Sequence, residues 1–282
     1  MKNGFLSIIK KLWTRIIGKT HSQSFIEFVS KLADIDLLFL SYRHMGILNY
    51  QNIYISGEEY VIKQVLSKYI SQVAPVFFDV GANKGKYSLE LRSEFPNAHI
   101  YAFEPNPNAF KILQSKLILS GDHCYCLGLG RVPKCQTIYT YSDSLDSTHA
   151  SIYREVFNDI HHSNDLTSIK IEVTTIDNFC NNNNIEQIDF LKVDTEGNEI
   201  DVLKGASHMI AENKISSIQF EFNEMNVISR VFLKDFYSLL TNFNIFRLDT
   251  HRLIPLPQYD TTNEIFKFQN FLAINKILDA KC

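Results

Sequence analysis

The stretch that decides the fold is Val76-Phe77-Phe78-Asp79-Val80-Gly81-Ala82-Asn83-Lys84-Gly85, in which a short apolar run leads into a loop with two glycines. An amphipathic segment over 86–95 follows, and Pro96 closes it. A strand that turns tightly into a helix needs glycine where a side chain would clash. Such a loop lets a ligand approach the backbone at the helix N-terminus. The stretch therefore predicts a strand, a ligand-binding loop and a helix.

The spacing of Gly81 and Gly85 separates this loop from two common nucleotide-binding loops. It is G-x-x-x-G, not the G-x-G-x-x-G of dinucleotide sites, and no Lys-Ser or Lys-Thr pair follows to make a phosphate-binding P-loop. A second apolar run, 99–103, ends in Glu104, which lies 19 residues after Gly85. An acid at this place typically accepts hydrogen bonds from ribose hydroxyls. Loop and acid together predict a site for a nucleoside ligand.

A second group of acids follows another expected strand, 188–193. Asp194, Glu196 and Glu199 lie within six residues of one another, at an edge where open α/β sheets place their ligands. We expect Glu199 to favour the N-terminus of the next helix electrostatically, and Asp194 and Glu196 to act in the chemistry. Gly205 is expected to end that helix in the left-handed conformation. From residue 74 onward, apolar runs alternate with amphipathic segments, which predicts a mostly parallel sheet with helices on both faces.

Together these motifs resemble the FkbM-type methyltransferases, a branch of the class I S-adenosylmethionine-dependent enzymes. The resemblance covers about residues 73–275. It is carried by Asp79-Val80-Gly81-Ala82-Asn83-x-Gly85, Phe103-Glu104-Pro105, Val173-Thr174-Thr175-Ile176-Asp177-Asn178-Phe179, Leu191-Lys192-Val193-Asp194-Thr195-Glu196-Gly197, Leu203-Lys204-Gly205-Ala206 and the Phe220-Glu221 strand. It implies an α/β fold with a Rossmann-like seven-stranded sheet. The last strand of this sheet, expected over 268–275, would be antiparallel.

The resemblance also implies the cofactor and the reaction. S-adenosylmethionine would be bound by Asp79, Gly81, Asn83, Gly85 and Glu104, with the two glycines at its methionine end and Glu104 at its ribose. The reaction would transfer a methyl group to a hydroxyl, and we expect this hydroxyl to belong to a sugar in a glycan or glycolipid. A small-metabolite acceptor and a catalytically silent cofactor-binding or interaction protein are the alternatives. A nicotinamide dehydrogenase fits less well because of the glycine spacing.

A sugar hydroxyl is poorly acidic, so a general base is expected to assist its attack. We predict that Asp194 and Glu196 are the catalytic residues. The other candidates are Glu221 within the apolar run 217–222 and, in a polar insertion, His149, His161 and His162. The insertion, 142–168, is expected to act as a lid over the acceptor. One departure concerns the adenine, because Arg131 stands where the family often has an acid.

The amino-terminal residues 1–24 are expected to form a basic amphipathic helical arm. Apolar and polar side chains over 5–18 fall on opposite halves of a helical wheel, and five basic residues precede the first acid, Glu27. Residues 1–20 therefore either lie on an anionic membrane surface or pack on protein. We expect packing on this chain or a second copy, with membrane contact as the alternative.

Two further domains are expected after this arm. Residues 25–72 are interpreted as a helical cap, in which Ser56-Gly57-Glu58-Glu59 has the form of a capping box that opens a helix through Ile70. Residues 73–282 are interpreted as the class I methyltransferase domain. The sequence does not predict an oligomeric state.

The composition excludes several classes of protein. The 282 residues are 45% hydrophobic and 21% charged, as in globular domains. A net charge of −3 predicts no nucleic-acid partner, and no apolar run reaches the 18 residues of a membrane span. Five cysteines, an odd number with irregular spacing, favour reduced thiols and a cytoplasmic location, at most peripheral to the inner membrane surface. Because Cys124-x-Cys126 lacks the usual zinc spacing, no metal is expected.

Overall fold

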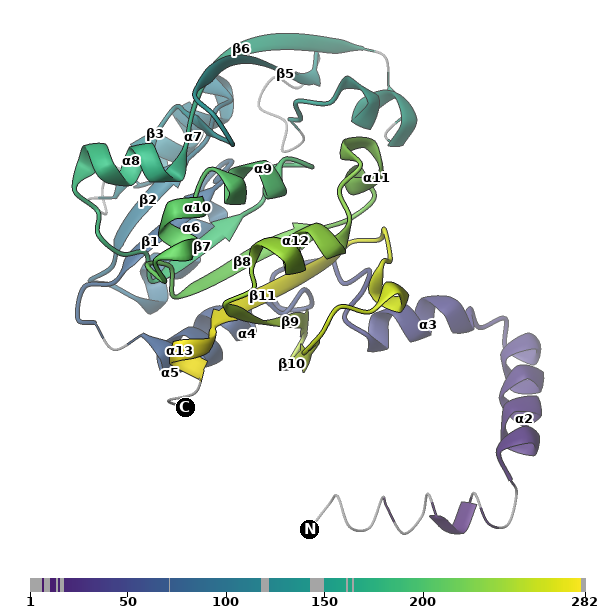
Figure 1. Ribbon diagram of the computed structural model, residues 1–282. Helices are drawn as coiled ribbons and strands as arrows, with labels where there is room; N and C mark the ends of the chain where they lie inside the picture. Colours follow the sequence, from purple (N-terminus) through teal and green to yellow (C-terminus); the bar gives the residue numbers. More distant parts are fainter. Residues whose placement is uncertain are drawn as a thin grey trace. The chain divides into compact units, whose positions relative to one another are not determined.

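The computed structural model describes residues 7, 11–13, 15, 18–70, 72–117, 122–142, 150–160, 162–163 and 165–279 (Figure 1). The chain divides into two compact units, residues 1–44 and residues 45–282, which we call the helical unit and the sheet unit. This division differs from the expected domains, because residues 45–72 belong to the same unit as the residues that follow them.

The sheet unit is built around eight strands in the order β10-β9-β11-β8-β7-β1-β2-β3. Their bounds are β1 Val76–Val80, β2 His99–Phe103, β3 His123–Tyr125, β7 Phe190–Val193, β8 Ser217–Phe222, β9 Phe243–Asp249, β10 Arg252–Pro255 and β11 Gln269–Asn275. Strands β3, β2, β1, β7 and β8 are parallel to one another, whereas β11 is antiparallel to both β8 and β9. This confirms the Rossmann-like sheet and its antiparallel last strand. The sheet has one strand more than the seven expected, because β10 pairs with β9 as an additional antiparallel strand.

Helices cover both faces of this sheet, as the sequence predicts. One face carries α4 (Glu58–Tyr60), the π-helical segment η1 (Val61–Val65), α5 (Leu66–Tyr69), α6 (Lys86–Glu94) and α7 (Pro107–Leu117). The other face carries α8 (Ile176–Asn183), α9 (Glu199–Lys204), α10 (Ser207–Ala211) and α12 (Leu233–Leu239). The remaining helical elements of the sheet unit are η3 (Val156–Ile160), α11 (Met225–Ser229), η4 (Thr261–Asn263) and α13 (Lys276–Asp279).

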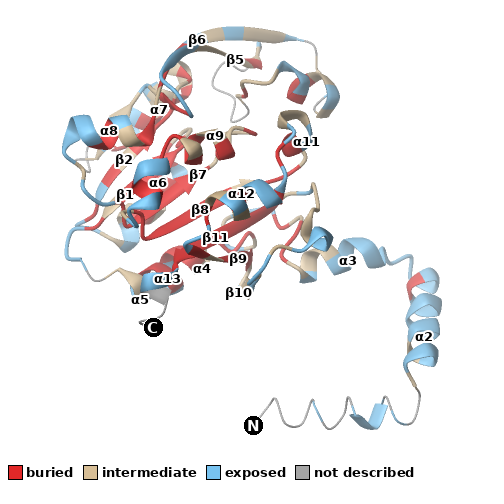
Figure 2. Cartoon of the chain, in the orientation of Figure 1, coloured by how far each residue is buried: buried red, intermediate tan, exposed pale blue. Residues whose placement is uncertain are grey.

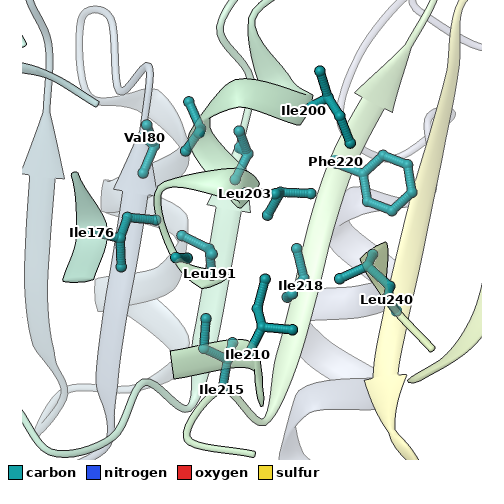
Figure 3. Packing of buried hydrophobic residues seen from close by; sticks show 14 of the residues in the cluster. Val80, Ile176, Leu191, Ile200, Leu203, Ile210, Ile215, Ile218, Phe220 and Leu240 are labelled. Carbon is teal, nitrogen blue, oxygen red and sulfur yellow. The ribbon is translucent and has the colours of Figure 1, made fainter. Parts of the chain in front are cut away.

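Two cores result, one on each face of the sheet. Phe77 and Phe78 are consecutive in β1, and both are fully buried, one in each core, because side chains alternate along a strand. In the larger core, Leu191 of β7 and Ile218 of β8 pack against Leu203 of α9 (Figure 3). These cores hold β1, β2 and β7 in place, so that their carboxyl ends meet at one edge.

A second, three-stranded sheet was not expected from the sequence. It consists of β4 (Gly128–Leu129), β6 (Leu166–Thr174) and β5 (Lys134–Tyr141), in that order. Strands β5 and β6 are antiparallel from the pair Lys134–Val173 to the pair Tyr141–Leu166. The end of the expected insertion 142–168 is therefore part of a strand.

Two local predictions are wrong for physical reasons. Ser56 is not an N-cap: the helix begins after Gly57, and the Ser56 hydroxyl donates to the Glu58 carboxylate over 2.8 Å. Gly205 is right-handed, with φ −74°. A Cβ at Gly205 would lie 2.0 Å from the carbonyl oxygen of Gly130, so glycine is needed there for close backbone approach.

The helical unit contains α2 (Lys19–Leu32) and α3 (Leu37–His44). The expected boundary at residues 24 and 25 falls inside α2, and the helix expected over 5–18 lies mostly outside the described residues. Most described side chains of this unit are exposed, and Ser30 is the one that is buried (Figure 2). Among the described residues, no helix combines the length and the apolar character that crossing a bilayer requires.

Candidate active site

A cavity of about 610 Å³ lies at the carboxyl ends of β1, β2 and β7. Its wall includes Gly81, Asn83, Glu104, Asp194 and Glu196, so the structure brings together both groups of residues that the sequence singled out. The second sheet supplies much of the apolar wall through Ile138, Ile171 and Val173. An open α/β sheet places its ligands at this edge.

The glycine loop is shaped by positive φ angles and close contacts at its two glycines. Gly81 has φ +79°, and a Cβ there would lie 1.7 Å from the carbonyl oxygen of Asp194. Gly85 has φ +80° and immediately precedes α6, where a Cβ would lie 2.8 Å from Leu113. Both glycines are therefore needed to bring the loop against its neighbours and to begin α6 at the cavity.

Glu104 is held at the end of β2 by two backbone groups. Its side chain is buried and accepts hydrogen bonds from the N–H of Asn83 and the N–H of Asn106, each over 2.8 Å. Burial raises the pKa of Glu104 to about 7, although both hydrogen bonds lower it. Each carboxylate oxygen has a second lone pair, so Glu104 can still accept hydrogen bonds from a diol in the cavity.

In the cavity wall, Lys192 joins two aspartates. Its ammonium group lies 3.1 Å from the Asp194 carboxylate and 3.5 Å from that of Asp79. Burial lowers the pKa of Lys192, but the carboxylates of Asp194, Asp79 and Glu58 outweigh it and raise this pKa above its ordinary value. Lys192 is thus cationic at neutral pH. Sequence reasoning missed it, although a lysine inside the apolar strand 190–193 was a signal.

Asp79, a predicted cofactor contact, does not line the cavity. It is fully buried, accepts a hydrogen bond from the Ser88 hydroxyl over 2.6 Å and faces Lys192. Its position therefore supports Lys192 and, through Lys192, Asp194. Direct contact between Asp79 and the cofactor stays a prediction.

The loop that carries Asp194 and Glu196 is fixed from below by Glu199. The Glu199 carboxylate accepts hydrogen bonds from the Thr195 N–H over 2.7 Å and the Gly197 N–H over 3.2 Å. Burial raises the pKa of Glu199 to about 7. From the other side, the Ser151 hydroxyl donates to the Glu196 carbonyl over 2.8 Å, which joins the insertion to this loop.

The other candidate bases are less well placed. Glu221 does not line the cavity, and burial together with the nearby carboxylates of Asp194 and Glu196 raises its pKa well above the ordinary value. His162 is exposed and does not line the cavity, whereas His149 and His161 lie outside the described residues. Within the part of the chain that the structure describes, no three His, Cys, Asp or Glu side chains are grouped to hold a metal ion.

A family model described as the methyltransferase FkbM domain matches residues 79–243. The chain belongs to the FkbM methyltransferase family. Methyltransferase 1 of Beauveria bassiana is 27% identical over 173 residues, 52% of this chain and 66% of that protein. The hexuronic acid methyltransferase AglP of Haloferax volcanii is 27% identical over 176 residues, 61% of this chain and 64% of that protein. This FkbM-family chain thus covers slightly under two thirds of the length of either relative.

A solved structure of methyltransferase FkbM from Methylobacillus flagellatus KT is also similar to this family member. The similarity covers 76% of this chain and 47% of that one, with 15% sequence identity and a TM-score of 0.45.

The cofactor of this FkbM methyltransferase is S-adenosylmethionine, and the residues present fit it. Glu104 presents a buried carboxylate to the cavity for the ribose hydroxyls. The glycine loop brings backbone close to the space where the methionine end would lie, at the N-terminus of α6. Leu127, Leu129 and Arg131 also line the cavity, and the two leucines offer apolar surface to an adenine ring.

Proposed function

We propose that this protein transfers a methyl group from S-adenosylmethionine to a hydroxyl of a saccharide, in a glycan or glycolipid. One observation carries the proposal: Glu104, expected at the ribose, and Asp194 and Glu196, expected at the acceptor, line a single cavity. A relative named for a hexuronic acid acceptor supports a sugar as the substrate. Proximity in one cavity matters because methyl transfer is an in-line displacement whose rate depends on alignment.

In the proposed reaction, the bound cofactor supplies an electrophilic methyl group on a sulfonium. Asp194 accepts the proton that the acceptor hydroxyl loses as the methyl group passes from the sulfonium sulfur to the hydroxyl oxygen, which leaves S-adenosylhomocysteine. The Asp194 side chain is about one third exposed, which lets it reach an acceptor, and Lys192 holds its carboxylate in position from 3.1 Å. Glu196 is a second carboxylate on the same loop and serves to orient the acceptor hydroxyls. The wall formed by Ile138 and Ile171 excludes water from the reacting groups.

The first experiment is a calorimetric titration with S-adenosylmethionine, S-adenosylhomocysteine and NAD. We expect both methyl-cycle ligands to bind and NAD not to bind. Labelled methyl transfer to hexuronic acid-containing and neutral oligosaccharides then tests the acceptor. Turnover on small soluble hydroxyl compounds alone would contradict a saccharide acceptor, and cofactor binding without any turnover would favour the silent cofactor-binding protein.

The proposed base is tested with Asp194→Asn. Removal of a general base is expected to lower kcat about 10²–10⁴-fold, and Glu196→Gln is expected to raise the KM for the acceptor. Glu186→Gln is the matched control, because it removes one negative charge from an exposed site before the opposite end of β7. An Asp194→Asn variant that keeps the kcat of this control would remove Asp194 as the base.

We also propose that the helical unit contacts an anionic membrane surface, which would place the enzyme at the inner face of the membrane, in the cytoplasm. Residues 1–44 contain seven Lys and Arg but three Asp and Glu. Large apolar side chains are exposed, among them Phe25, Phe28 and Leu32 of α2 and Leu38 of α3. Basic charge together with exposed apolar side chains favours binding to anionic lipid.

Cosedimentation with vesicles tests this contact. The full chain should sediment with anionic vesicles, less with zwitterionic ones and less at high salt. Phe25→Ser with Phe28→Ser should abolish sedimentation. Sedimentation that depends on neither lipid charge nor salt would contradict the proposal. So would light scattering that shows a dimer for the wild type and a monomer for the double variant.

A further inference from the structure

The residues before the family-matched region take part in the cavity. The family match begins at residue 79, yet residues 45–69 belong to the sheet unit and bring Ile53 and Glu58 to the cavity wall. Glu58 was singled out from the sequence as part of a capping box, a role that the structure does not give it. Its carboxylate is therefore free of helix capping and faces the space expected to hold the ligand.

Packing determines where the Glu58 carboxylate points. One oxygen accepts a hydrogen bond from the Ser56 hydroxyl over 2.8 Å, and the other accepts one from the Gln219 amide over 3.2 Å. Gln219 is itself held by the Tyr87 hydroxyl over 2.9 Å. Gly57, at φ +84°, approaches the carbonyl oxygen of Asp249 so closely that a Cβ would lie 2.6 Å from it. The turn before Glu58 is thus tightly constrained.

The carboxylates around Glu58 outnumber the positively charged groups beside them. Lys192 lies within 4 Å of Asp79 and Asp194, and its positive charge is shared between them. Burial raises the pKa of Glu58 despite the attraction of the same lysine, and Glu58 forms no ion pair of its own with any residue that the structure describes. Three carboxylates thus share one ammonium group at this end of the cavity. Negative charge in excess of its partners is unfavourable when buried, and a cationic ligand would offset it.

We propose that Glu58 binds the positively charged methionine end of S-adenosylmethionine, so that residues 45–69 form part of the cofactor site. This inference rests on the proposed function, which makes that cofactor the ligand of the cavity. The methionine end carries two positive groups, the sulfonium and the α-ammonium, and a carboxylate suits either. Glu58 would act together with Glu104, which holds the ribose at the other side of the glycine loop.

The test compares two neighbouring substitutions by calorimetry. Glu58→Gln keeps the shape and hydrogen-bonding capacity of the side chain but removes its charge. Glu59→Gln removes the same charge one residue later, from a side chain that does not line the cavity and pairs with Lys63 on the surface. We expect Glu58→Gln to weaken S-adenosylmethionine binding about 10- to 100-fold, the range of a hydrogen bond to a charged group. Glu59→Gln should change it by less than about twofold.

S-adenosylhomocysteine tells the two positive groups apart, because it keeps the α-ammonium but has no sulfonium. A loss confined to S-adenosylmethionine assigns Glu58 to the sulfonium, and an equal loss for both ligands assigns it to the ammonium. Equal affinities of the Glu58→Gln and Glu59→Gln variants for both ligands would overturn the inference. Failure of the wild-type protein to bind either ligand would instead overturn the proposed function.

Thermal denaturation checks that each variant is folded. If Glu58→Gln is not, Glu58→Ala replaces it, since alanine adds no second amide beside that of Gln219, and the same losses are expected. Glu58→Asp retains the charge on a shorter side chain, and its affinity should fall between those of the wild type and the uncharged variant. Affinity of Glu58→Ala equal to that of Glu59→Gln would overturn the inference in the same way.

Discussion

Two carboxylates face the cavity from strands on either side of β1, yet their surroundings differ. Glu104, after β2, is buried and held by two backbone N–H groups, and burial raises its pKa to about 7. Asp194, after β7, is more exposed and lies 3.1 Å from the Lys192 ammonium. Glu104 is therefore suited to accept hydrogen bonds from neutral hydroxyls, whereas Asp194 is held beside a positive charge. One edge of one sheet thus offers two kinds of acid.

The difference comes from the residues underneath. Lys192 is two positions before Asp194 in β7, so its side chain lies on the same face of the strand, and Asp79 supports it from β1. Among the described residues, no cation forms an ion pair with Glu104; its partners are backbone N–H groups of the glycine loop and of the start of α7. The comparison is testable by removing each set of partners separately.

The largest effect is expected from Lys192→Met, which removes the cation beside Asp194 and leaves the partners of Glu104 unchanged. Asp79 would remain buried without its charged partner, and breaking a buried pair in this way typically lowers the free energy of unfolding by about 3–5 kcal/mol. Urea denaturation measures this loss. Lys204→Met is the control, because its pair with Asp201 at 3.7 Å is exposed and should contribute about 1 kcal/mol or less. Similar losses in the two variants would show that Lys192 is not a buried partner of Asp79.

A smaller effect is expected from Glu104→Gln, which changes the carboxylate that follows β2. Loss of the charged acceptor should weaken S-adenosylmethionine binding by roughly 1.5–3 kcal/mol, as for a hydrogen bond to a charged group. Calorimetry measures the affinity, with Glu94→Gln at the exposed end of α6 as the control. An unchanged affinity would remove Glu104 from the cofactor site and leave the two carboxylates without different roles.

The raised pKa of Glu104 also predicts how stability depends on pH. The folded protein holds the proton up to about pH 7, whereas the ordinary value is 4.5. At low pH, Glu104 makes its full contribution to the free energy of unfolding. This contribution is lost as the pH rises from about 4.5 to 7, by at most about 1.4 kcal/mol per pH unit. Denaturation at pH 5, 6 and 7 should show the wild type losing stability relative to Glu104→Gln. A constant difference between the two proteins would mean that Glu104 titrates normally.

The features that the sequence predicted rest on residues that lie close together along the chain. Gly81 and Gly85 could be recognised because a strand, a tight turn and a helix follow one another directly along the chain, and Glu104 because it ends the next strand, 19 residues after Gly85. Gly205 was misinterpreted, because the contact that requires glycine there is with Gly130, far away in sequence.

The same limit applies to the site residues that sequence reasoning missed. Nothing in the sequence indicated that Glu58 lines the cavity, since its partner Gln219 lies 161 residues later. The second sheet depends on pairing β5 with β6 across the insertion, which local patterns do not reveal. A site assembled from distant segments is thus visible in the sequence only where each piece has a local motif.

The smallest effect is expected from alanine substitutions at two helix N-caps, one of which lies beside Glu104. Asn106 and Thr175 are both helix N-caps: their side chains accept hydrogen bonds from the N–H groups of Asn108 and Asn178, each over 3.0 Å. Replacing either by alanine should lower the free energy of unfolding by about 1 kcal/mol. The backbone N–H of residue 106, which alanine keeps, also holds Glu104. Loss of the cap loosens the start of α7 that positions this N–H, so Asn106→Ala should in addition weaken S-adenosylmethionine binding a few-fold, whereas Thr175→Ala should not. If both variants bound the cofactor equally well, the start of α7 would stabilise the helix without positioning Glu104, and the contrast with Asp194 would rest on burial alone.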